Sequence, residues 1–239
     1  MPEESWRHFY ESDLQAVYSL LVVPALFLAY LIIAGRRRSV QSRLPDARFV
    51  LGYCVFFALE TLLDPLAAGP LVEGLDLGNT ATEALMLLFV LLGDFRVFLL
   101  VFHLAGRERN LGRALLWASA FTPIVPILAW TFNEILVAWR PELAHQRLYL
   151  IYELSFVALA LLLRNLYLPH KDPEDSGGHS RFLRGALSYV AVYYGLWAGA
   201  DALILLGGLD AGWLLRALPN QLYYAFWVPF VFFTFLRRG

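Results

Sequence analysis

Long apolar runs, each bounded by short polar segments, repeat along the whole chain. A helix that crosses a bilayer needs about 20 consecutive, mostly apolar residues. Seven runs meet this requirement, at residues 15–35, 47–69, 82–105, 112–132, 148–168, 184–207 and 213–236. The pattern therefore predicts an all-α, polytopic membrane protein, in which residues 1–239 form a single seven-transmembrane-helix bundle.

The amino-acid composition agrees with this pattern. Hydrophobic residues make up 59% of the chain and charged residues 16%, whereas a soluble domain has roughly 45–50% and about 25%. The net charge of -1 gives no reason to expect a nucleic-acid partner, because such proteins carry basic surfaces for the phosphate backbone. The expected partner is the lipid bilayer, with room for a small-molecule or lipid ligand inside the bundle.

Basic residues are distributed unevenly between the two sides of the predicted helices. Fourteen of the 19 Lys and Arg residues lie in one set of connections and ends, four lie in the other, and Arg96 lies inside a helix. Cytoplasmic loops carry the excess of Lys and Arg, so the N-terminus is predicted outside and the C-terminus cytoplasmic. We therefore expect an integral protein of the plasma (inner) membrane. The first run follows acidic rather than basic residues, which argues against a cleaved signal peptide.

Two cytoplasmic connections have similar settings in the two halves of the chain. The polar segment 168–181, interpreted as a flexible linker, leads into the sixth predicted helix. In the same way, the basic segment 35–48 leads into the second predicted helix. Each leads into a helix with an acidic residue near its outer end. This layout suggests a 3+1+3 parallel repeat, in which residues 112–132 form the connecting helix and the stretch 115–132 within it carries no charge.

Ionisable residues inside the predicted helices are the most informative positions. They are Glu60, Asp64, Asp94, Arg96, Glu153 and Asp201. A charge near the centre of a bilayer costs at least ~2.5–3.5 kcal/mol on insertion scales, and such residues usually face the bundle interior. A helix rises about 1.5 Å per residue, which with the predicted orientation places the carboxylates mainly in the outer half of the membrane. Their convergence predicts an outward-facing cavity.

Aromatic residues share helical faces with these acids, since positions three, four and seven apart lie on one side of a helix. The face that carries Asp201 also carries Trp197 and Tyr194. Arg96 lies two residues from Asp94 and so points elsewhere, which makes it the predicted charge partner of an acid on a neighbouring helix. The predicted ligand-binding residues are Glu60, Asp94, Glu153, Asp201, Trp197, Tyr194, Asn220 and Tyr223.

Each of these features also has a purely structural interpretation. Asp64 precedes Pro65 and can lie at the level of the lipid headgroups, and Arg216 can extend its charged end to the membrane surface. Tyr and Trp residues form interfacial belts in many membrane proteins. The buried acids can hold helices together through interhelical hydrogen bonds, which contribute about 0.6 kcal/mol each.

The predicted helix count and external N-terminus resemble the microbial rhodopsins in outline. That family holds retinal as a Schiff base on a lysine of the seventh helix. Here the segment 213–236 contains no lysine, and Lys171, the single lysine of the chain, lies in a polar connection. Retinal is therefore not expected.

Metal and cofactor chemistry is not expected either. Of the five histidines only His103 lies in a predicted helix, whereas membrane hydrolases of the ceramidase and adiponectin-receptor type bind zinc with several intramembrane histidines. Cys54 is the single cysteine, so one chain can form neither a disulfide nor a cysteine zinc site. The segment "ETLLD" at 60–64 has the carboxylate spacing of the Mg²⁺–diphosphate motif of membrane prenyltransferases, but a second aspartate-rich motif is absent. We predict no cofactor and no metal.

Three classes of function fit these features. The first is a small multi-pass transporter or permease that binds a cationic or polar small solute in an outer-half cavity of carboxylates and aromatic rings. The second is a membrane-embedded enzyme that acts on a lipid or isoprenoid, with carboxylates as acid and base. The third is a non-catalytic membrane sensor or structural subunit. The sequence favours the first and leaves enzymatic activity and the oligomeric state open.

Overall fold

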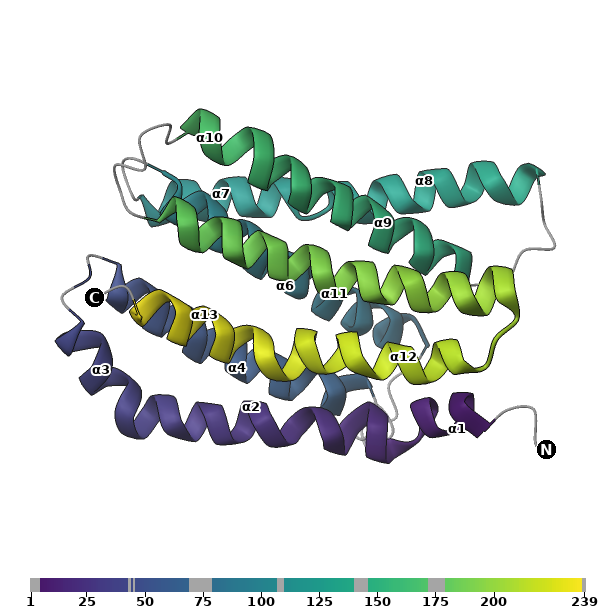
Figure 1. The fold of residues 1–239 in the computed structure, drawn as a ribbon, viewed down its shortest axis with the longest axis horizontal. Helices are drawn as coiled ribbons and strands as arrows, with labels where there is room; N and C mark the ends of the chain where they lie inside the picture. Colours follow the sequence, from purple (N-terminus) through teal and green to yellow (C-terminus); the bar gives the residue numbers. More distant parts are fainter. Residues whose placement is uncertain are drawn as a thin grey trace. The chain divides into compact units, whose positions relative to one another are not determined.

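The computed structural model describes residues 5–42, 44, 46–68, 79–106, 110–139, 146–171 and 179–237. Every regular element within these ranges is a helix, as predicted for an all-α chain, and Figure 1 shows them in chain order from purple to yellow. Some of the basic residues used to predict the orientation lie outside the described residues, namely Arg43, Arg107, Arg109, Arg140 and Arg238. The orientation therefore remains a prediction.

Six helices are long and apolar enough to cross a membrane, as expected of an integral membrane protein. They span Leu14–Gln41, Ala47–Ala67, Thr80–Leu104, Leu111–Ala138, Arg147–Lys171 and Ser180–Gly207. Each overlaps one of the first six predicted segments. The apolar pattern therefore located these six helices correctly.

Several of these helices consist of more than one element, including short π-helical stretches (η). A short helix, α1 (Ser5–Glu11), comes first. The six long helices contain η1 (Leu14–Tyr18), α2 (Ser19–Tyr30), η2 (Leu31–Gly35) and α3 (Arg36–Gln41); α4 (Ala47–Ala68); α6 (Asn79–Leu104); α7 (Leu111–Phe121) and α8 (Ile124–Trp139); α9 (Gln146–Leu162), η3 (Leu163–Tyr167) and α10 (Leu168–Lys171); and α11 (Ser180–Gly207). Helices α10 and α11 thus extend into the predicted linker 168–181, of which residues 172–178 lie outside the described residues.

The seventh predicted segment is helical but differs from the other six. Elements α12 (Ala211–Asn220), η4 (Gln221–Phe226) and α13 (Trp227–Leu236) follow one another directly. In the described part of the chain, this run is not one of the six helices that are apolar enough to cross a membrane. Asn220 and Gln221 lie at its middle and Arg216 lies one turn earlier, which makes the run more polar than the rest.

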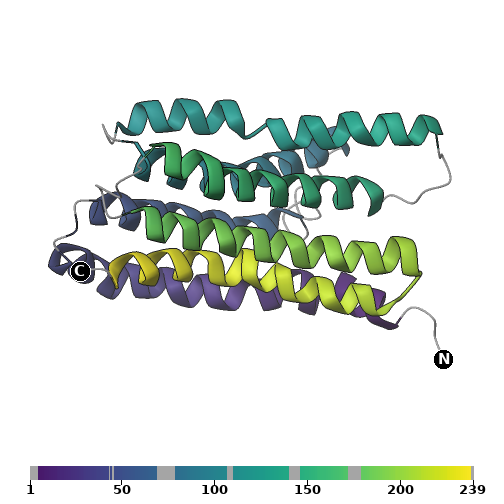
Figure 2. The same ribbon diagram turned by 45° about the horizontal axis from the view of Figure 1, so that its top comes forward.

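The chain divides into two compact units, of which the first comprises Met1–Tyr10 and Asp94–Pro219. In this unit α9 packs against both α8 and α11, and Figures 1 and 2 show the three helices side by side. The rings of Phe156 on α9 and Tyr194 on α11 stack with their centroids 4.3 Å apart. The α9–α11 interface therefore has an aromatic centre, and the polar side chains of the candidate site lie around it.

The second unit comprises Glu11–Gly93 and Asn220–Gly239. Here α4 packs against α2 and α13, and α2 packs against η4. Trp227 on α13 is fully buried and its indole N–H donates a hydrogen bond to the Tyr53 hydroxyl at 3.0 Å. At Gly93 an added Cβ would overlap the Tyr223 hydroxyl, so this close approach requires a glycine. Aromatic side chains thus make close contacts in the second unit.

Candidate functional site

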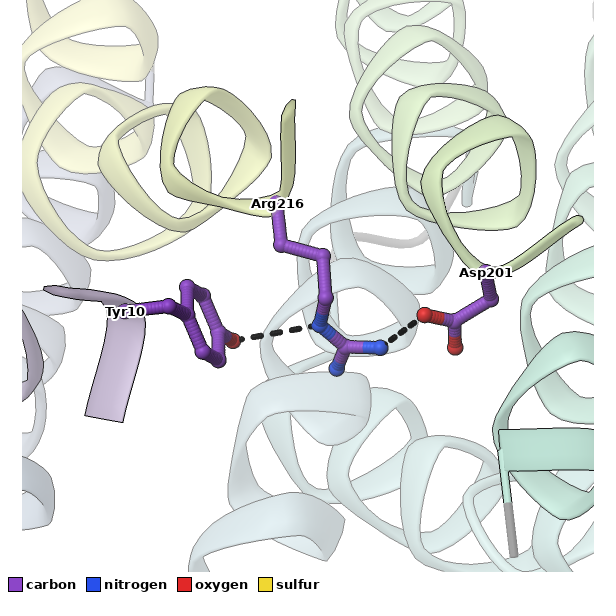
Figure 3. Close-up of polar contacts among 3 residues, drawn as sticks. All are labelled: Tyr10, Asp201 and Arg216. Atoms are coloured by element: carbon purple, nitrogen blue, oxygen red, sulfur yellow. Dashed lines mark hydrogen bonds and ion pairs between the residues drawn. The ribbon is translucent and has the colours of Figure 1, made fainter. Parts of the chain in front are cut away.

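An ion pair joins α11 to α12 within the first unit. Nη1 of Arg216 donates a hydrogen bond to Oδ1 of Asp201, and Nε of Arg216 donates to the Tyr10 hydroxyl at 3.3 Å. Figure 3 shows the guanidinium lying between the Tyr10 side chain and the Asp201 carboxylate. The side chain of Asp201 is 0% exposed and that of Arg216 is 13% exposed. Water therefore screens this charge pair weakly, which strengthens the attraction.

The turn between α11 and α12 places Arg216 opposite Asp201. Helix α11 ends at Gly207, and the next residue, Gly208, adopts the left-handed conformation with φ of 59°. Glycine adopts this conformation readily because it lacks a Cβ. Helix α12 then approaches α11 closely, since a Cβ at Gly212 would lie 2.7 Å from the Ala200 carbonyl oxygen. Arg216 lies one helical turn after Gly212 and shares its face. That face therefore meets α11 at Asp201, the neighbour of Ala200.

The short helix α1 positions Tyr10. The Asp210 carboxylate accepts hydrogen bonds from the backbone N–H of Trp6 at 2.9 Å and of Arg7 at 3.3 Å. The first N–H groups of a helix have no partner within the helix, and a carboxylate is favourable there. This contact attaches α1 to the turn between α11 and α12. As a result, Tyr10 on α1 lies next to Arg216.

Three aromatic rings lie close to the guanidinium of Arg216. Its Cζ atom is 5.4 Å from the ring centroid of Tyr10, 5.7 Å from that of Tyr149 and 5.8 Å from that of Trp213. A cation within about 6 Å of a ring centroid is attracted by the negative face of the ring. The position therefore favours a positive charge through both the carboxylate and the rings.

Glu153 on α9 brings a second carboxyl group to the ion pair. Its side chain is 4% exposed, and it lies within hydrogen-bonding range of Asp201 and electrostatic range of Arg216. Within the described residues, no group donates a hydrogen bond to Oε2 of Glu153 or Oδ2 of Asp201. When both carboxyls are ionised, two negative charges face one positive charge. One proton on the pair would balance the charge and allow a hydrogen bond between the carboxyl groups.

A second buried acid, Asp94 on α6, is bound by two tyrosines. The Tyr194 hydroxyl donates to Oδ1 of Asp94 at 2.8 Å, and the Tyr152 hydroxyl donates to Oδ2. The Asp94 side chain is 1% exposed. Its hydrogen bonds therefore come from uncharged groups, in contrast to the ion pair at Asp201.

Arg96, the predicted charge partner, belongs to the surroundings of Asp94. It is fully buried and interacts electrostatically with Asp94 and Tyr193. The ion pair at Asp201 is formed by Arg216 instead.

The two acidic centres of the first unit involve the same two helices. Tyr152 and Glu153 are consecutive on α9, while Tyr194 and Asp201 are seven residues apart on α11, a distance of about 10 Å along the axis. Trp197 lies between them in the sequence, and its ring centroid is 5.5 Å from that of Tyr194. The α9–α11 interface therefore carries polar and aromatic groups that lead from one centre to the other.

The remaining predicted site residues, Glu60, Asn220 and Tyr223, belong to the second unit. All three are buried. Glu60 lies within electrostatic range of Tyr224, which also interacts with Asp64. The carboxyl groups of the second unit therefore have their own surroundings, and the centre at Asp201 is built from the first unit.

Sequence reasoning did not select Arg216 or Tyr10 for the site. The sequence did contain a sign of Arg216, because Asp201 and Arg216 are almost equally far along the chain from Gly208, the residue that follows α11. Residues equally distant from a tight turn between antiparallel helices lie at the same level. Tyr10 has no comparable signal, since its position depends on the contact of α1 with Asp210.

Comparison with known proteins does not assign a family. The chain matches no protein-family model, no curated protein and no solved structure. The proposed function therefore rests on the chemistry of the side chains described here.

Proposed function

We propose that the chain is a small multi-pass membrane transporter that exchanges a proton for a cationic, amine-bearing solute at Glu153, Asp201 and Arg216. One observation carries this proposal: two buried carboxyl groups lie beside a single guanidinium. With both carboxyls ionised, the centre lacks one positive charge. Either a proton or a cationic solute can supply that charge, so the two compete for the same centre.

Charge balance determines which states of this exchange centre are stable in a membrane. An uncompensated buried charge costs several kcal/mol, so the centre without a proton or a cation is disfavoured. The centre therefore releases its proton when a cation binds and takes up a proton when the cation leaves. This competition is the coupling that proton-driven exchange requires, and intramembrane carboxylates commonly provide it.

The aromatic rings around the exchange centre support a cationic rather than an anionic solute. Tyr10, Tyr149 and Trp213 already contact the Arg216 guanidinium through their ring faces. An amine that binds beside the guanidinium can contact the parts of these rings that Arg216 does not cover, and a desolvated cation–π contact contributes about 2 kcal/mol. An anion would be repelled by the rings and by the carboxylates.

Asp94 serves as the second proton acceptor in this proposal. Tyr152 and Tyr194, which donate to Asp94, have hydroxyl groups that can both donate and accept hydrogen bonds. Tyr152 is the sequence neighbour of Glu153, so helix α9 contributes a residue to each of the two centres.

The proposed transporter has seven membrane-crossing helices, with Ala211–Leu236 as the seventh. Its N-terminus lies outside and its C-terminus in the cytoplasm of a plasma (inner) membrane, as the distribution of Lys and Arg favours. In this orientation the exchange centre faces the outside. A 3+1+3 arrangement of the helices would suit alternating access, because many transporters consist of two repeats that move around one site.

Proton release on solute binding tests the proposal directly. The purified full-length protein is mixed in weakly buffered detergent solution with amines, inorganic cations and sugars, and a pH-sensitive dye follows the protons. The wild type is expected to release about one proton for each amine bound. Thermal stabilisation by amines is expected to increase with pH, because the deprotonated exchange centre is the form that binds a cation.

Variants at the two carboxyl groups distinguish an exchange site from a structural network. Glu153→Gln and Asp201→Asn each leave one carboxylate for Arg216, so the charge is balanced without a proton or a cation. Both should abolish proton release and weaken amine binding by about tenfold or more, a difference of ~1.4 kcal/mol or above. Glu134→Gln makes the same chemical change at an exposed position of α8 and should alter neither measurement. Identical proton release and stabilisation in all variants and the wild type would contradict the proposal.

A further inference from the structure

A pocket at one end of the second unit is separate from the exchange centre. It has a volume of about 570 Å³ and is lined by Arg38, Gln41, Ser42, Phe233, Leu236 and Arg237. The first three residues lie at the end of α3 and the other three at the end of α13. The two helix ends therefore border an open pocket of the size that small ligands occupy.

Two guanidinium groups make this pocket basic. Arg38 and Arg237 are exposed, and neither forms an ion pair within the described residues. Cζ of Arg38 lies 5.8 Å from the ring centroid of Tyr30, and this packing leaves the N–H groups at the guanidinium edge available to donate. None of the six lining residues is acidic. An anion with several acceptor oxygens is the ligand that these donors recognise.

Another part of the pocket wall is apolar and well packed. Phe233 and Leu236 are half-buried, and the ring centroid of Phe233 is 5.7 Å from that of Phe27 and 5.6 Å from that of Tyr30. A free phosphate ion gains nothing from such a wall, whereas a phospholipid can bury part of an acyl chain against it. The pocket also lies at the end of the apolar helix Leu14–Gln41, where lipid headgroups meet a membrane protein.

We propose that this pocket binds the phosphate of an anionic phospholipid through Arg38 and Arg237. The two guanidinium groups donate to the phosphate oxygens, the Gln41 amide adds an uncharged donor, and Phe233 contacts the start of an acyl chain. Basic pockets between transmembrane helices are known to hold anionic headgroups on the cytoplasmic side. The predicted orientation places this end of the second unit on that side. A bound lipid would link α3 to α13.

Lipid titration of the purified full-length protein tests this site. The delipidated protein is titrated with phosphatidylglycerol, with phosphatidylcholine of the same acyl chains and with inorganic phosphate, and native mass spectrometry counts the bound molecules. One phosphatidylglycerol per chain is expected at concentrations where the other two probes leave the protein unbound. Phosphatidylcholine binding as tight as phosphatidylglycerol would overturn the proposal, because the charge would then be irrelevant. Inorganic phosphate binding as tight as phosphatidylglycerol would overturn it in favour of a free-anion site.

Two double variants and a matched control assign the binding to the two arginines. Arg38→Gln/Arg237→Gln should weaken phosphatidylglycerol binding roughly 30-fold. Arg38→Lys/Arg237→Lys keeps both charges but loses the paired donors, so a smaller loss is expected, and this variant guards against a folding defect. Arg181→Gln/Arg184→Gln removes two exposed arginines of α11 and should bind like the wild type. Equal binding by the wild type, both double variants and the control would overturn the assignment.

Discussion

The polar centres of the first unit and the aromatic interface of the second unit are stabilised in different ways. In the first unit Asp201 pairs with Arg216, and Asp94 accepts hydrogen bonds from two tyrosines. In the second unit, α4 and α13 meet around Trp227, which is fully buried and donates its single N–H to Tyr53. The stability of the first arrangement depends on charges and hydrogen bonds, and that of the second depends on how the aromatic side chains pack.

This difference separates residues that can change state from residues that maintain the fold. The energy of aromatic packing does not depend on protonation, whereas a group of two carboxyls and one guanidinium changes its net charge with every proton gained or lost. The proposed transporter needs both kinds of region, because a site that changes charge must be held in a frame that does not. The pH dependence of stability is therefore the property that distinguishes the two regions.

The largest effect is expected from Arg216→Gln, which removes the positive charge from the exchange centre. The two buried carboxyl groups then have no counter-charge beside them, and breaking a buried ion pair in this way costs about 3–5 kcal/mol. Thermal unfolding in detergent should show this loss at neutral and alkaline pH. The loss should be smaller at acidic pH, where protonation removes the negative charges.

A second substitution sharpens this test. Asp201→Asn added to Arg216→Gln removes one of the unpaired charges and should recover part of the lost stability. A loss of stability in Arg216→Gln that is equal at every pH would show that Arg216 acts through packing, like the aromatic residues of the second unit.

An intermediate effect, equal at every pH, is expected from Gly93→Ala in the second unit. The new Cβ would overlap the Tyr223 hydroxyl and lie 2.7 Å from its Cζ, and overpacking of this kind costs about 1–3 kcal/mol. Tyr223→Phe removes the hydroxyl, so the double variant should have a Tm between those of Gly93→Ala and the wild type. Gly52→Ala, whose added Cβ meets no atom within 4 Å, is the control and should keep the wild-type Tm. A loss in Gly93→Ala that changes with pH would contradict the comparison.

The smallest effect is expected from Tyr194→Phe, which removes one hydrogen bond to Asp94 and keeps the ring. An interhelical hydrogen bond in a membrane protein contributes about 0.6 kcal/mol, and Tyr152 still donates to Asp94 in this variant. Combining Tyr194→Phe with Tyr152→Phe leaves the buried acid without either hydroxyl and should cost more than the sum of the single changes. Tyr18→Phe, at a residue that is 60% exposed, is the control. A double variant as stable as the wild type would show that Asp94 does not depend on these hydroxyls.

The positions of the first six long helices could be predicted because burial in lipid depends mainly on composition, whereas their lengths could be predicted only in part. The second predicted segment begins at residue 47 and the sixth ends at residue 207, as the corresponding helices do. The first helix continues to Gln41, past the predicted end at residue 35. Arg36, Arg37 and Arg38 lie in this extension, since a helix can continue into the headgroup layer after its apolar part has ended. An apolar run therefore predicts where lipid ends better than where the helix ends.

The partners of the buried side chains could be predicted only in part. Helical spacing places Tyr194, Trp197 and Asp201 on one face of α11, and the contact between the Tyr194 and Trp197 rings agrees with that placement. Spacing does not identify the helix that lies opposite this face. The hydrogen bond from Tyr194 to Asp94 joins residues 100 positions apart, and such contacts depend on how helices pack. The pairing of Asp201 with Arg216 depends likewise on the close approach of α12 at Gly212.

The single cysteine has a practical consequence for studying this protein. Cys54 is completely buried, and its thiol lies 3.9 Å from the Val228 carbonyl oxygen. A buried thiol in apolar surroundings is inert toward water-soluble reagents. A cysteine introduced on the surface would therefore be the one that reacts, and Cys54 need not be replaced first. Fluorophores or spin labels can thus be attached one position at a time to the native sequence.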